Sequence, residues 1–587
     1  MKKFATKSQT FRQIIEDGLL YADKTRYIYN LIRDHKFCFL SRPRRFGKTL
    51  LLDTLQELFQ GNQELFKGLW IDPETIIDNA KSSFDTQNET ILPFSFKKHP
   101  IIRLDMAYDK TDTPEELKNE IIGDLREIAL QEGIAVTGDS FHRIIGNMTN
   151  GLTNKYGERA ILLVDEYDSP VTDHINNYKV ARANSKVLHN FYRVIKSYSA
   201  RFDFGFVTGI SRFAMTSLES GPNNFSDISM DPEYAGVCGF TIPEFDALFA
   251  DRMDETLKIF KERNHGDNDF TVTDLRRAIL EWYDGYNWLG PDQALNPFSI
   301  IKFFTKRHFS NYWIHSGRPF HLETLIQRKP MDFIQLKLDS YTTEELTESK
   351  LNQLEPAPVL FHSGYLTIDR KKDALINFNQ KIDMFNMDEE ESIEVFFLKI
   401  PNKEVKTTYK EYCFRTIFGS GYKDIQGLGA ELVYAFSNKR SEEITILLDK
   451  IFGNITYWRR IAREKYYHGI VHASLLAAGL RVESEKLGRL GRSDLVVILP
   501  DKKYVIIEIK YLRNIENNIQ SSLIDALDGA LEQIEMTDYS GPYRILNPTE
   551  IIGLGIVFYG KNMVAAKFWK GRDLRLPPPL GTDTRDE

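Results

Sequence analysis

Two short apolar segments, each with charged residues at one end, constrain the fold of the C-terminal part of this chain most strongly. Residues 494–499 begin with an aspartate, and residues 504–510 end in Glu-Ile-Lys. A turn-forming Pro-Asp-Lys-Lys sequence separates them, which predicts a β-hairpin. Burying two acids and a lysine at apolar strand ends is costly unless the charges pair or hold a metal. The spacing predicts a Mg²⁺ site that cleaves phosphodiesters.

The hairpin loop decides on which face these charges lie. Side chains alternate along a strand, so Glu508 and Lys510 share one face, and Asp494 shares a face with Val496. The two charged sets meet only if the loop has an odd number of residues or a strand contains a bulge, because a one-residue slip turns every side chain over. A three-residue loop, Asp501–Lys503, would place Asp494 opposite Lys510.

This arrangement resembles the core of the PD-(D/E)XK nuclease superfamily. Asp494 and the Glu-Ile-Lys run ending at Lys510 match its signature, although Ser493 replaces the usual proline. Glu464, on a preceding helix, resembles the acid that often joins that site, and Gln533 resembles a following helical residue. The order helix, strand, strand, helix, strand also matches, with residues 551–559 expected as the last strand.

The resemblance implies a metal-dependent hydrolysis. Asp494 and Glu508 would hold Mg²⁺ (or Mn²⁺) together with the carbonyl of Ile509, and the metal would polarise the phosphate and acidify the attacking water. Lys510 would orient that water or neutralise charge developing on the phosphate, and Glu464 would complete the metal site or position the water. The alternative is an amphipathic hairpin whose glutamate and lysine form a surface ion pair.

A second motif lies near the N-terminus. The apolar strand expected at residues 37–40 precedes Ser41-Arg-Pro-Arg-Arg-Phe-Gly-Lys-Thr49, and a helix is expected over residues 50–59. A strand, a loop with Gly-Lys-Thr and a helix form the context of a P-loop. Lys48 would reach the β and γ phosphates of ATP, Thr49 would ligate Mg²⁺, and the amides at the helix start would bind phosphate oxygens.

The loop departs from the strict P-loop pattern, because Arg42 occupies the position of its first glycine. Glycine permits backbone conformations that other residues resist. Gly47 is retained, and Arg42, Arg44 and Arg45 are expected to contact phosphates or, with Pro43, to stiffen the loop.

Two later strands end in polar residues. The buried run Ala160–Val164 leads into Asp165 and Glu166, as in a Walker B strand. Asp165 would hold Mg²⁺ through water, and Glu166 would polarise the hydrolytic water. Thr208 resembles a sensor of the γ-phosphate, and Arg212 would contact phosphate in cis or in a neighbouring subunit. Gly-Lys-Thr can cap any helix and Asp-Glu can end any strand, but together they favour nucleotide binding.

The N-terminal part resembles an AAA-ATPase-like family that carries this arginine-rich P-loop and often ends in a PD-(D/E)XK domain. Tyr21–Thr25, Glu281–Tyr286 and Asn296–Ser299 match further signatures of that family. From the residues alone, Asp23 is expected to form a turn and helix cap, and Tyr283–Tyr286 to form a structural turn. Alternating strands and helices predict a doubly wound parallel sheet.

The chain is therefore expected to be an α/β multidomain protein. The expected parts are a P-loop NTPase-like domain over residues 1–240, a helical, winged-helix-like lid over 241–385, a connector over 386–455 and an α/β nuclease-fold domain over 456–587. The aromatic residues of the lid are expected to form its core and not a base-stacking platform. These residues are Phe303, Phe304, Phe309, Tyr312 and Trp313.

Composition limits the partners. The 587 residues, 42% hydrophobic and 27% charged, suit a globular protein of several domains. The net charge of −7 implies no general polyanion-binding surface, so nucleic acid would need a local basic patch. Basic residues do gather near the candidate nuclease site: Arg459, Arg460, Arg463, Lys465, Lys486, Arg489, Arg492, Lys510 and Arg513.

The expected compartment is the cytoplasm. Cys38, Cys238 and Cys413 are scattered and odd in number, which indicates a reducing environment and no disulfide framework. The basic N-terminus lacks the apolar segment of a signal peptide, and no apolar run approaches the length of a membrane span.

The leading hypothesis is an ATP-binding, Mg²⁺-dependent endonuclease or exonuclease in which the ATPase regulates cleavage of nucleic acid, with DNA expected. The alternative is a non-cutting ATP-dependent switch or scaffold that binds nucleic acid through a nuclease-like domain. A protein-remodelling motor is a third hypothesis, but the sequence has no obvious substrate-threading loop. If Arg212 acts on a neighbouring subunit, the protein is a homo-oligomer. Such a protein would suit defence against foreign DNA, mobile-element biology or repair.

Overall fold

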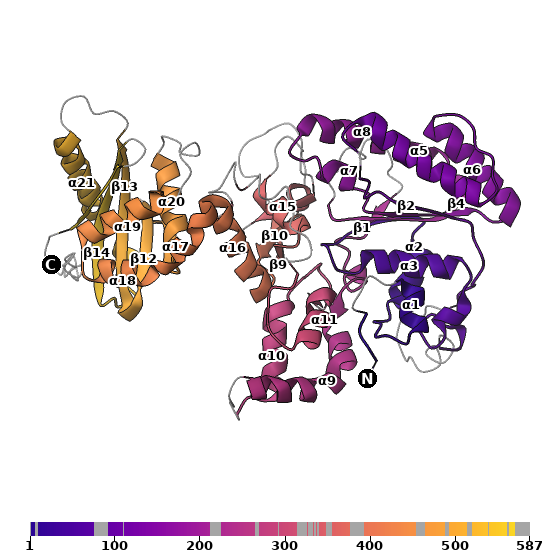
Figure 1. Cartoon of the computed structure of the whole chain (residues 1–587), viewed down its shortest axis with the longest axis horizontal. Helices are drawn as coiled ribbons and strands as arrows, with labels where there is room; N and C mark the ends of the chain where they lie inside the picture. Colours follow the sequence, from indigo (N-terminus) through magenta and orange to yellow (C-terminus); the bar gives the residue numbers. More distant parts are fainter. Residues whose placement is uncertain are drawn as a thin grey trace, which may run out of the picture. The chain divides into compact units, whose positions relative to one another are not determined.

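The computed structural model describes residues 2–5, 10–75, 92–109, 111–211, 225–263, 269–291, 293–313, 326, 333, 336, 338, 340–347, 355–375, 392–453, 464–487, 492–512, 519–537, 539–559 and 563–569. The chain forms two compact units. Unit one comprises Met1–Thr324 with Leu336–Tyr409, and unit two comprises Leu325–Gln335 with Lys410–Glu587. Figure 1 shows the helices and strands of both.

Unit one is built on a parallel sheet of five strands in the order β2-β3-β4-β1-β5. Its central strands are almost continuous apolar runs, because helices cover both faces of a parallel sheet. The predicted parallel sheet is confirmed. The strands are β1 (Phe37–Ser41), β2 (Ile101–Asp105), β3 (Ala160–Asp165), β4 (Phe202–Gly209) and β5 (Ser226–Asp227).

Helices lie on both faces of this sheet, as a doubly wound fold requires (Figure 1). Leu162 and Val164 of β3 pack into a core with Ile121, Ile145 and Leu188 of the helices on one face. That face carries α5 (Pro114–Gln131), α6 (Phe141–Tyr156) and α8 (Tyr178–Ser197), with the short α7 (Ser169–Thr172) beside them. The other face carries α1 (Phe11–Glu16), α2 (Thr25–Asp34) and α3 (Lys48–Phe59).

A second subdomain of unit one follows the sheet. Its helices are α9 (Ile242–Arg263), α10 (Val272–Tyr283), α11 (Pro297–Lys306), α14 (Thr343–Thr347) and α15 (Pro356–His362). It also contains the pair β6 (Phe240–Thr241) and β7 (Ala294–Leu295), and an antiparallel sheet of β8 (Tyr341–Thr342), β10 (Ser392–Lys399) and β9 (Thr367–Leu375). Helices were expected in this part of the chain, whereas the sheet was not predicted.

The aromatic residues of this subdomain form its core, as predicted. Phe303 and Phe304 are fully enclosed, and Phe309 and Tyr312 pack against the same cluster. Trp313 is also buried. Phe303 and Phe304 therefore have no face available for stacking on a base, and Phe309 and Tyr312 contribute to the same core.

Unit two is built on a sheet in the order β11-β12-β13-β14-β15, in which only β13 and β14 are parallel. Two strands, β11 and β15, were not predicted, so the strand expected at residues 551–559 is not the last one. The strands are β11 (Arg481–Leu487), β12 (Arg492–Leu499), β13 (Lys503–Leu512), β14 (Glu550–Tyr559) and β15 (Met563–Phe568).

Helices α20 (Glu464–Ala477) and α21 (Ile519–Met536) pack on opposite faces of this sheet. The ring of Tyr467 in α20 stacks on Tyr511 and Phe558. On the other face, Leu531 and Ile534 of α21 pack with Ile506 of β13. Side chains of β13 thus alternate between packing against α20 and packing against α21.

Further helices lead into unit two: α16 (Lys403–Phe418), α17 (Tyr422–Gly427), α18 (Gly429–Ser437) and α19 (Ser441–Gly453), and the short α22 (Gly541–Arg544) follows α21. The helix expected over residues 428–452 is broken between α18 and α19, where Lys439 has a left-handed backbone. One of the boundaries between the units, after Tyr409, falls inside α16. The boundary expected near residue 386 lies outside the described residues. No described helix combines the length and apolarity needed to span a membrane.

Candidate functional sites

The loop between β1 and α3 has the shape of a P-loop. Gly47 takes a left-handed conformation (φ 98°) and begins α3, and Arg45 is also left-handed. The ammonium group of Lys48 donates to the carbonyl oxygens of Arg42 (3.0 Å) and Pro43 (3.2 Å). Burial lowers the pKa of Lys48, and the charge of Asp165 opposes that shift. The lysine is therefore folded over the loop in which a phosphate group would sit.

The predicted Walker B residue meets the P-loop. The hydroxyl of Thr49 donates to a carboxylate oxygen of Asp165 at 2.7 Å, across 116 positions of sequence. Burial raises the pKa of Asp165, and the bond from Thr49 counteracts this. Asp105, at the end of β2, is paired in register with Asp165. These groups offer the hard oxygen ligands that Mg²⁺ prefers.

Asp105 was not singled out in the sequence. A signal was present, because the apolar run Ile101–Leu104 ends in this acid just as Ala160–Val164 ends in Asp165. Only the pairing of β2 with β3 shows that the two carboxylates are neighbours.

Glu166 and Asp168 have different surroundings. Glu166 has a left-handed backbone (φ 45°), and its half-buried carboxylate accepts a bond from the Ser169 hydroxyl at 3.1 Å. Asp168 is fully enclosed and accepts from the amides of Ile210 and Ser211. Glu166 is thus the more accessible acid after β3, while Asp168 holds the end of β4.

Of the two roles expected for Arg42, the structure favours stiffening of the loop over contact with phosphate. Its side chain is 1% exposed, and its guanidinium donates to the carbonyls of Ser41, Ser229 and Tyr234. It also lies 4.2 Å above the ring of Trp288, and burial lowers its pKa to about 10. Its backbone is not left-handed, so this position needs no glycine and instead anchors the loop.

The other two arginines of the loop are more accessible. Arg45 is exposed and lies 5.2 Å from the ring of Phe298. Arg44 is half-buried, and its charge lowers the pKa of Asp173 against the larger, opposite effect of burial. Neither side chain is enclosed as Arg42 is.

Thr208 does not occupy a sensor position. Its hydroxyl is fully buried and donates to the carbonyl of Leu40 at 2.9 Å, which ties β4 to β1. The prediction fails because a threonine at a strand end can bond the neighbouring strand instead of a ligand. Arg212 lies outside the described residues.

Asp23 forms the predicted turn. One of its carboxylate oxygens accepts from the Thr25 amide at 2.9 Å, and the other accepts from the Trp70 amide at 2.7 Å. Lys24 pairs with Glu244 of α9 at 2.6 Å. The Tyr21–Thr25 segment is therefore a structural junction.

In unit two, the hairpin of β12 and β13 has the odd loop that the hypothesis requires. Leu499 pairs with Lys503, so the loop is the three residues Pro500–Lys502. The loop starts one residue earlier than expected. Continuing the register from Leu495 and Ile507 places Asp494 opposite Glu508, and the prediction that it faces Lys510 is wrong.

Four side chains converge at this end of the hairpin. Asp494 accepts a hydrogen bond from the amide of Ile509 at 2.8 Å, and only 4% of the Glu508 side chain is exposed. The ammonium group of Lys510 lies 3.2 Å from Glu508 and 2.5 Å from the amide oxygen of Gln533 in α21. Gln533 in turn donates to the Tyr539 hydroxyl at 3.1 Å. A glutamine on α21 thus fixes the lysine beside the buried acid.

Helix α20 passes close to the same strands. A ring nitrogen of His468 lies 2.8 Å from the carbonyl oxygen of Asp494. One turn later, burial lowers the pKa of His472 to about 4, so this imidazole is neutral at pH 7. Glu464 is the first residue of α20, one turn before His468, and its side chain lies outside the described part of the structure.

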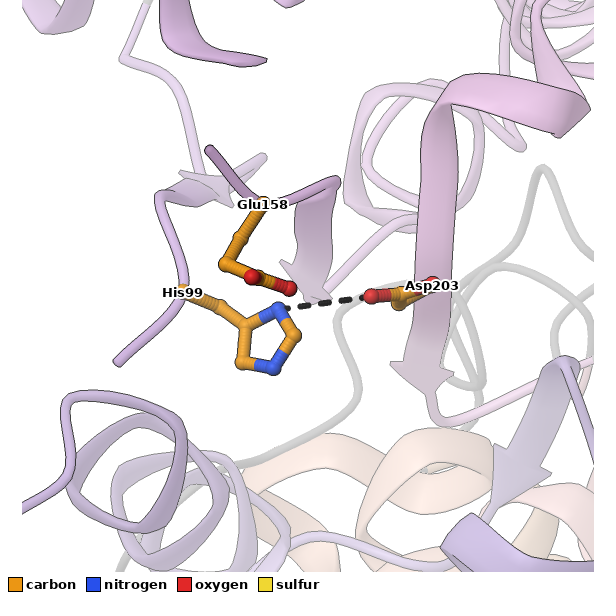
Figure 2. A group of neighbouring side chains, drawn as sticks. All are labelled: His99, Glu158 and Asp203. Carbon is orange, nitrogen blue, oxygen red and sulfur yellow. Dashed lines mark ion pairs between the residues drawn. The ribbon is translucent and has the colours of Figure 1, made fainter. Parts of the chain in front are cut away.

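A different polar cluster lies in unit one, at the end of the parallel sheet where its strands begin and away from the P-loop, which follows the end of β1. Figure 2 shows His99, Glu158 and Asp203 pointing toward one another near the starts of β2, β3 and β4. His99 lies 3.5 Å from Asp203. Lys97 pairs with Glu158, and Arg159 pairs with Asp203 at 2.5 Å. Because each carboxylate already has a cation, this cluster is an ion-pair network that joins three strands.

The two sites define a P-loop ATPase-like protein with a nuclease-fold domain. Residues 7–219 match the family described as "Predicted AAA-ATPase", and residues 462–568 match the PD-(D/E)XK nuclease superfamily. The "Uncharacterized protein in vnfD 5'region" of Azotobacter chroococcum mcd 1 is 30% identical over 562 residues, which cover 94% of this chain and 96% of that protein. The chain belongs to the AAA-ATPase-like family and carries a C-terminal PD-(D/E)XK nuclease superfamily domain.

Proposed function

We propose that this protein is an ATP-binding, metal-dependent nuclease in which the N-terminal ATPase domain regulates cleavage of DNA by the C-terminal site. The observation that carries the proposal is the convergence of Asp494, Glu508, Lys510 and Gln533 at one end of the hairpin. A domain that only bound nucleic acid would have no need to bury a glutamate and hold a lysine beside it, since burying such charges is costly.

The donor atoms of this site fit Mg²⁺ or Mn²⁺. The carboxylates of Asp494 and Glu508 and the carbonyl of Ile509 are hard oxygen ligands on adjacent strands. When bound, the metal supplies an activated water and a polarised phosphate. Lys510, held by Gln533, stabilises negative charge that develops on the phosphate. Glu464 completes the metal site or positions the water.

At the nucleotide site, Lys48 and the amides after Gly47 bind the phosphates of ATP. Thr49 and Asp165 hold its Mg²⁺, with Asp105 beside them, and Glu166 orients the hydrolytic water. Arg44 and Arg45 neutralise phosphate charge at the mouth of the loop. Arg212 acts in cis or on a neighbouring subunit of a homo-oligomer.

The test of the nuclease is cleavage of linear, circular and single-stranded DNA, and of RNA, by the full-length protein with Mg²⁺, Mn²⁺ or EDTA. Asp494→Asn should lose cleavage, because the replacement removes a charged ligand. Asp501→Asn is the matched control, since it makes the same change in the hairpin turn, where Asp501 is left-handed and exposed. Linearised circles would indicate an endonuclease, and preference for RNA would correct the substrate.

Cleavage that persists in Asp494→Asn or in EDTA would contradict the proposed site. No cleavage of any substrate by a protein that still binds ATP would favour the non-cutting switch.

A further inference from the structure

Every residue from Arg42 to Phe46 touches the second subdomain of unit one. Arg42 lies over Trp288, and Arg45 lies beside Phe298. The ring of Phe46 meets the rings of Tyr286 and Trp288 at 4.8 and 5.3 Å. Pro43 packs so closely against Gly364 that a Cβ atom there would lie 2.7 Å from the proline ring. The P-loop therefore packs against residues of the second subdomain that lie more than 200 positions later in the chain.

The remaining contact, at Arg44, is a hydrogen bond to the backbone. The indole N–H of Trp313 donates to the Arg44 carbonyl at 3.2 Å. Because Lys48 binds the carbonyls of Arg42 and Pro43, three consecutive carbonyls of the loop are held. Lys48 binds the carbonyls of Arg42 and Pro43 on the side where nucleotide would bind. Trp313 of the second subdomain binds the carbonyl of Arg44.

Trp313 is itself fixed by a buried acid. Its backbone amide donates to one carboxylate oxygen of Glu404 at 2.8 Å, and the hydroxyl of Ser299 donates to the other oxygen at 2.8 Å. Glu404 is 1% exposed. A single carboxylate thus joins the segment that carries the tryptophan to the start of α11.

Glu404 also lies in the first turn of α16, the helix within which the chain passes from unit one to unit two. Asn402 caps this helix by accepting from the Val405 amide at 3.0 Å and donating to the Asp284 carbonyl at 2.8 Å. Gly285 leaves no room for a side chain, since a Cβ atom would lie 2.1 Å from the Pro401 carbonyl oxygen. The start of α16 is thus built tightly into unit one.

We propose that Glu404 is a positioning residue for nucleotide binding, which acts through Trp313 to hold the P-loop and so links the occupied state of the loop to the start of α16. This inference rests on the proposed ATP site. It adds the contacts through which nucleotide binding at that site would affect the start of α16. Nucleotide that draws Lys48 away from the loop carbonyls would alter the loop that Trp313 grips.

The chemistry of the acid supports this role. Burial raises the pKa of Glu404 to about 7, while bonds from the amides of Trp313 and Tyr312 and from the Ser299 hydroxyl lower it. The phenols of Tyr283, Tyr286 and Tyr312 also face it, and its charge raises the pKa of each in addition to burial. Protonation removes the charge and one acceptor site, which weakens its bonds to the two amides.

The test is titration calorimetry of full-length protein with the Mg²⁺ complex of a non-hydrolysable ATP analogue, from pH 6 to pH 8.5. The Glu404→Gln variant should bind about tenfold more weakly than wild type at pH 8, which is one hydrogen-bond energy. The affinity ratio of wild type to this variant should shrink as the pH falls through 7. Trp313→Phe should also weaken binding, because it removes only the indole donor.

Trp70→Phe is the control for the tryptophan, since it makes the same substitution where the ring packs on Tyr29 of α2. Its affinity should equal that of wild type. Equal affinity and the same pH profile in wild type and Glu404→Gln would overturn the inference while the ATP site stood. Absence of binding by wild type would instead refute the nucleotide site itself, and this inference with it.

Discussion

The charged residues around the P-loop differ in what surrounds them. Arg42 and Lys48 are both buried cations of one short loop. The guanidinium of Arg42 is held by carbonyls and by the Trp288 ring, an environment that suits a planar cation with several donors. Lys48 has one compact charge near Asp165, and in the proposed nucleotide site it would exchange the loop carbonyls for phosphate oxygens. The two residues carry the same charge, but Arg42 anchors the loop and Lys48 is the proposed ligand-binding group.

Glu404→Gln is expected to reduce the pH dependence of the free energy of unfolding. The pKa of Glu404 rises from 4.5 to about 7 on folding, so its contribution to stability is complete below pH 4.5 and is lost as the pH rises through 7. The shift corresponds to about 3 kcal/mol. The variant should therefore lose less stability than wild type between pH 5 and pH 8, measured by calorimetric unfolding.

The control for this change is Glu411→Gln on the same helix, where 41% of the side chain is exposed. It should unfold with the pH dependence of wild type. An equal loss of stability in wild type and Glu404→Gln would show that the acid is not buried as described.

Lys510→Met should lower the cleavage rate by about 100-fold or more, because a positioned charge that stabilises the transition state contributes on that order. Lys503→Met changes the same residue type at the other end of β13, where the lysine pairs loosely with Glu550 at 3.5 Å, and should cut normally. Rates measured under single-turnover conditions would decide. Equal rates in Lys510→Met and wild type would remove the lysine from the site.

At the scale of elements, the helices and strands that could be predicted are those marked by a short, contiguous sequence pattern. The strands β1 and β3 and the helix α3 follow from apolar runs and from Gly47-Lys48-Thr49. Strands β11 and β15 were missed because they lie at the edges of their sheet and carry charged residues within short apolar patterns.

The site residues also divide into those that a local sequence pattern predicts and those that depend on tertiary contacts. The Thr49–Asp165 contact and the odd hairpin loop follow from motif spacing and strand alternation. The sequence left the role of Arg42 open between two alternatives and gave Thr208 a sensor role, because their partners, such as Tyr234 and Leu40, are set by tertiary packing. The role of Glu404 depends on Trp313, 91 positions away, and carries no local signal.

The β12–β13 turn offers a test of the hairpin geometry. Lys502 is left-handed (φ 55°), a conformation that costs about 1 kcal/mol in residues with a side chain and little in glycine. Lys502→Gly should therefore raise the unfolding midpoint of unit two, whereas Lys503→Gly, at an extended strand position (φ −91°), should lower it. Thermal unfolding followed by circular dichroism would test this. Destabilisation by both substitutions would contradict the loop Pro500–Lys502 and hence the register of Asp494.

At the scale of the whole molecule, the two candidate sites lie in separate compact units, and α16 spans one of the boundaries between these units. Separate sites should fail separately. Lys48→Ala should abolish ATP binding, while Asp494→Asn should abolish cutting and bind ATP as wild type does, as measured by calorimetry and by cleavage. Loss of ATP binding in a folded Asp494→Asn protein would contradict a two-site molecule.

In the proposed function, nucleotide bound in unit one controls cleavage in unit two. The most direct measurement is the initial rate of DNA cleavage by wild type and by Lys48→Ala, with and without ATP, at constant free Mg²⁺. We expect ATP to change the wild-type rate by about tenfold, within the range of typical coupling between sites, and to leave the rate of Lys48→Ala unchanged. A wild-type protein that binds ATP and cuts DNA at the same rate with and without it would show that nucleotide does not control cleavage.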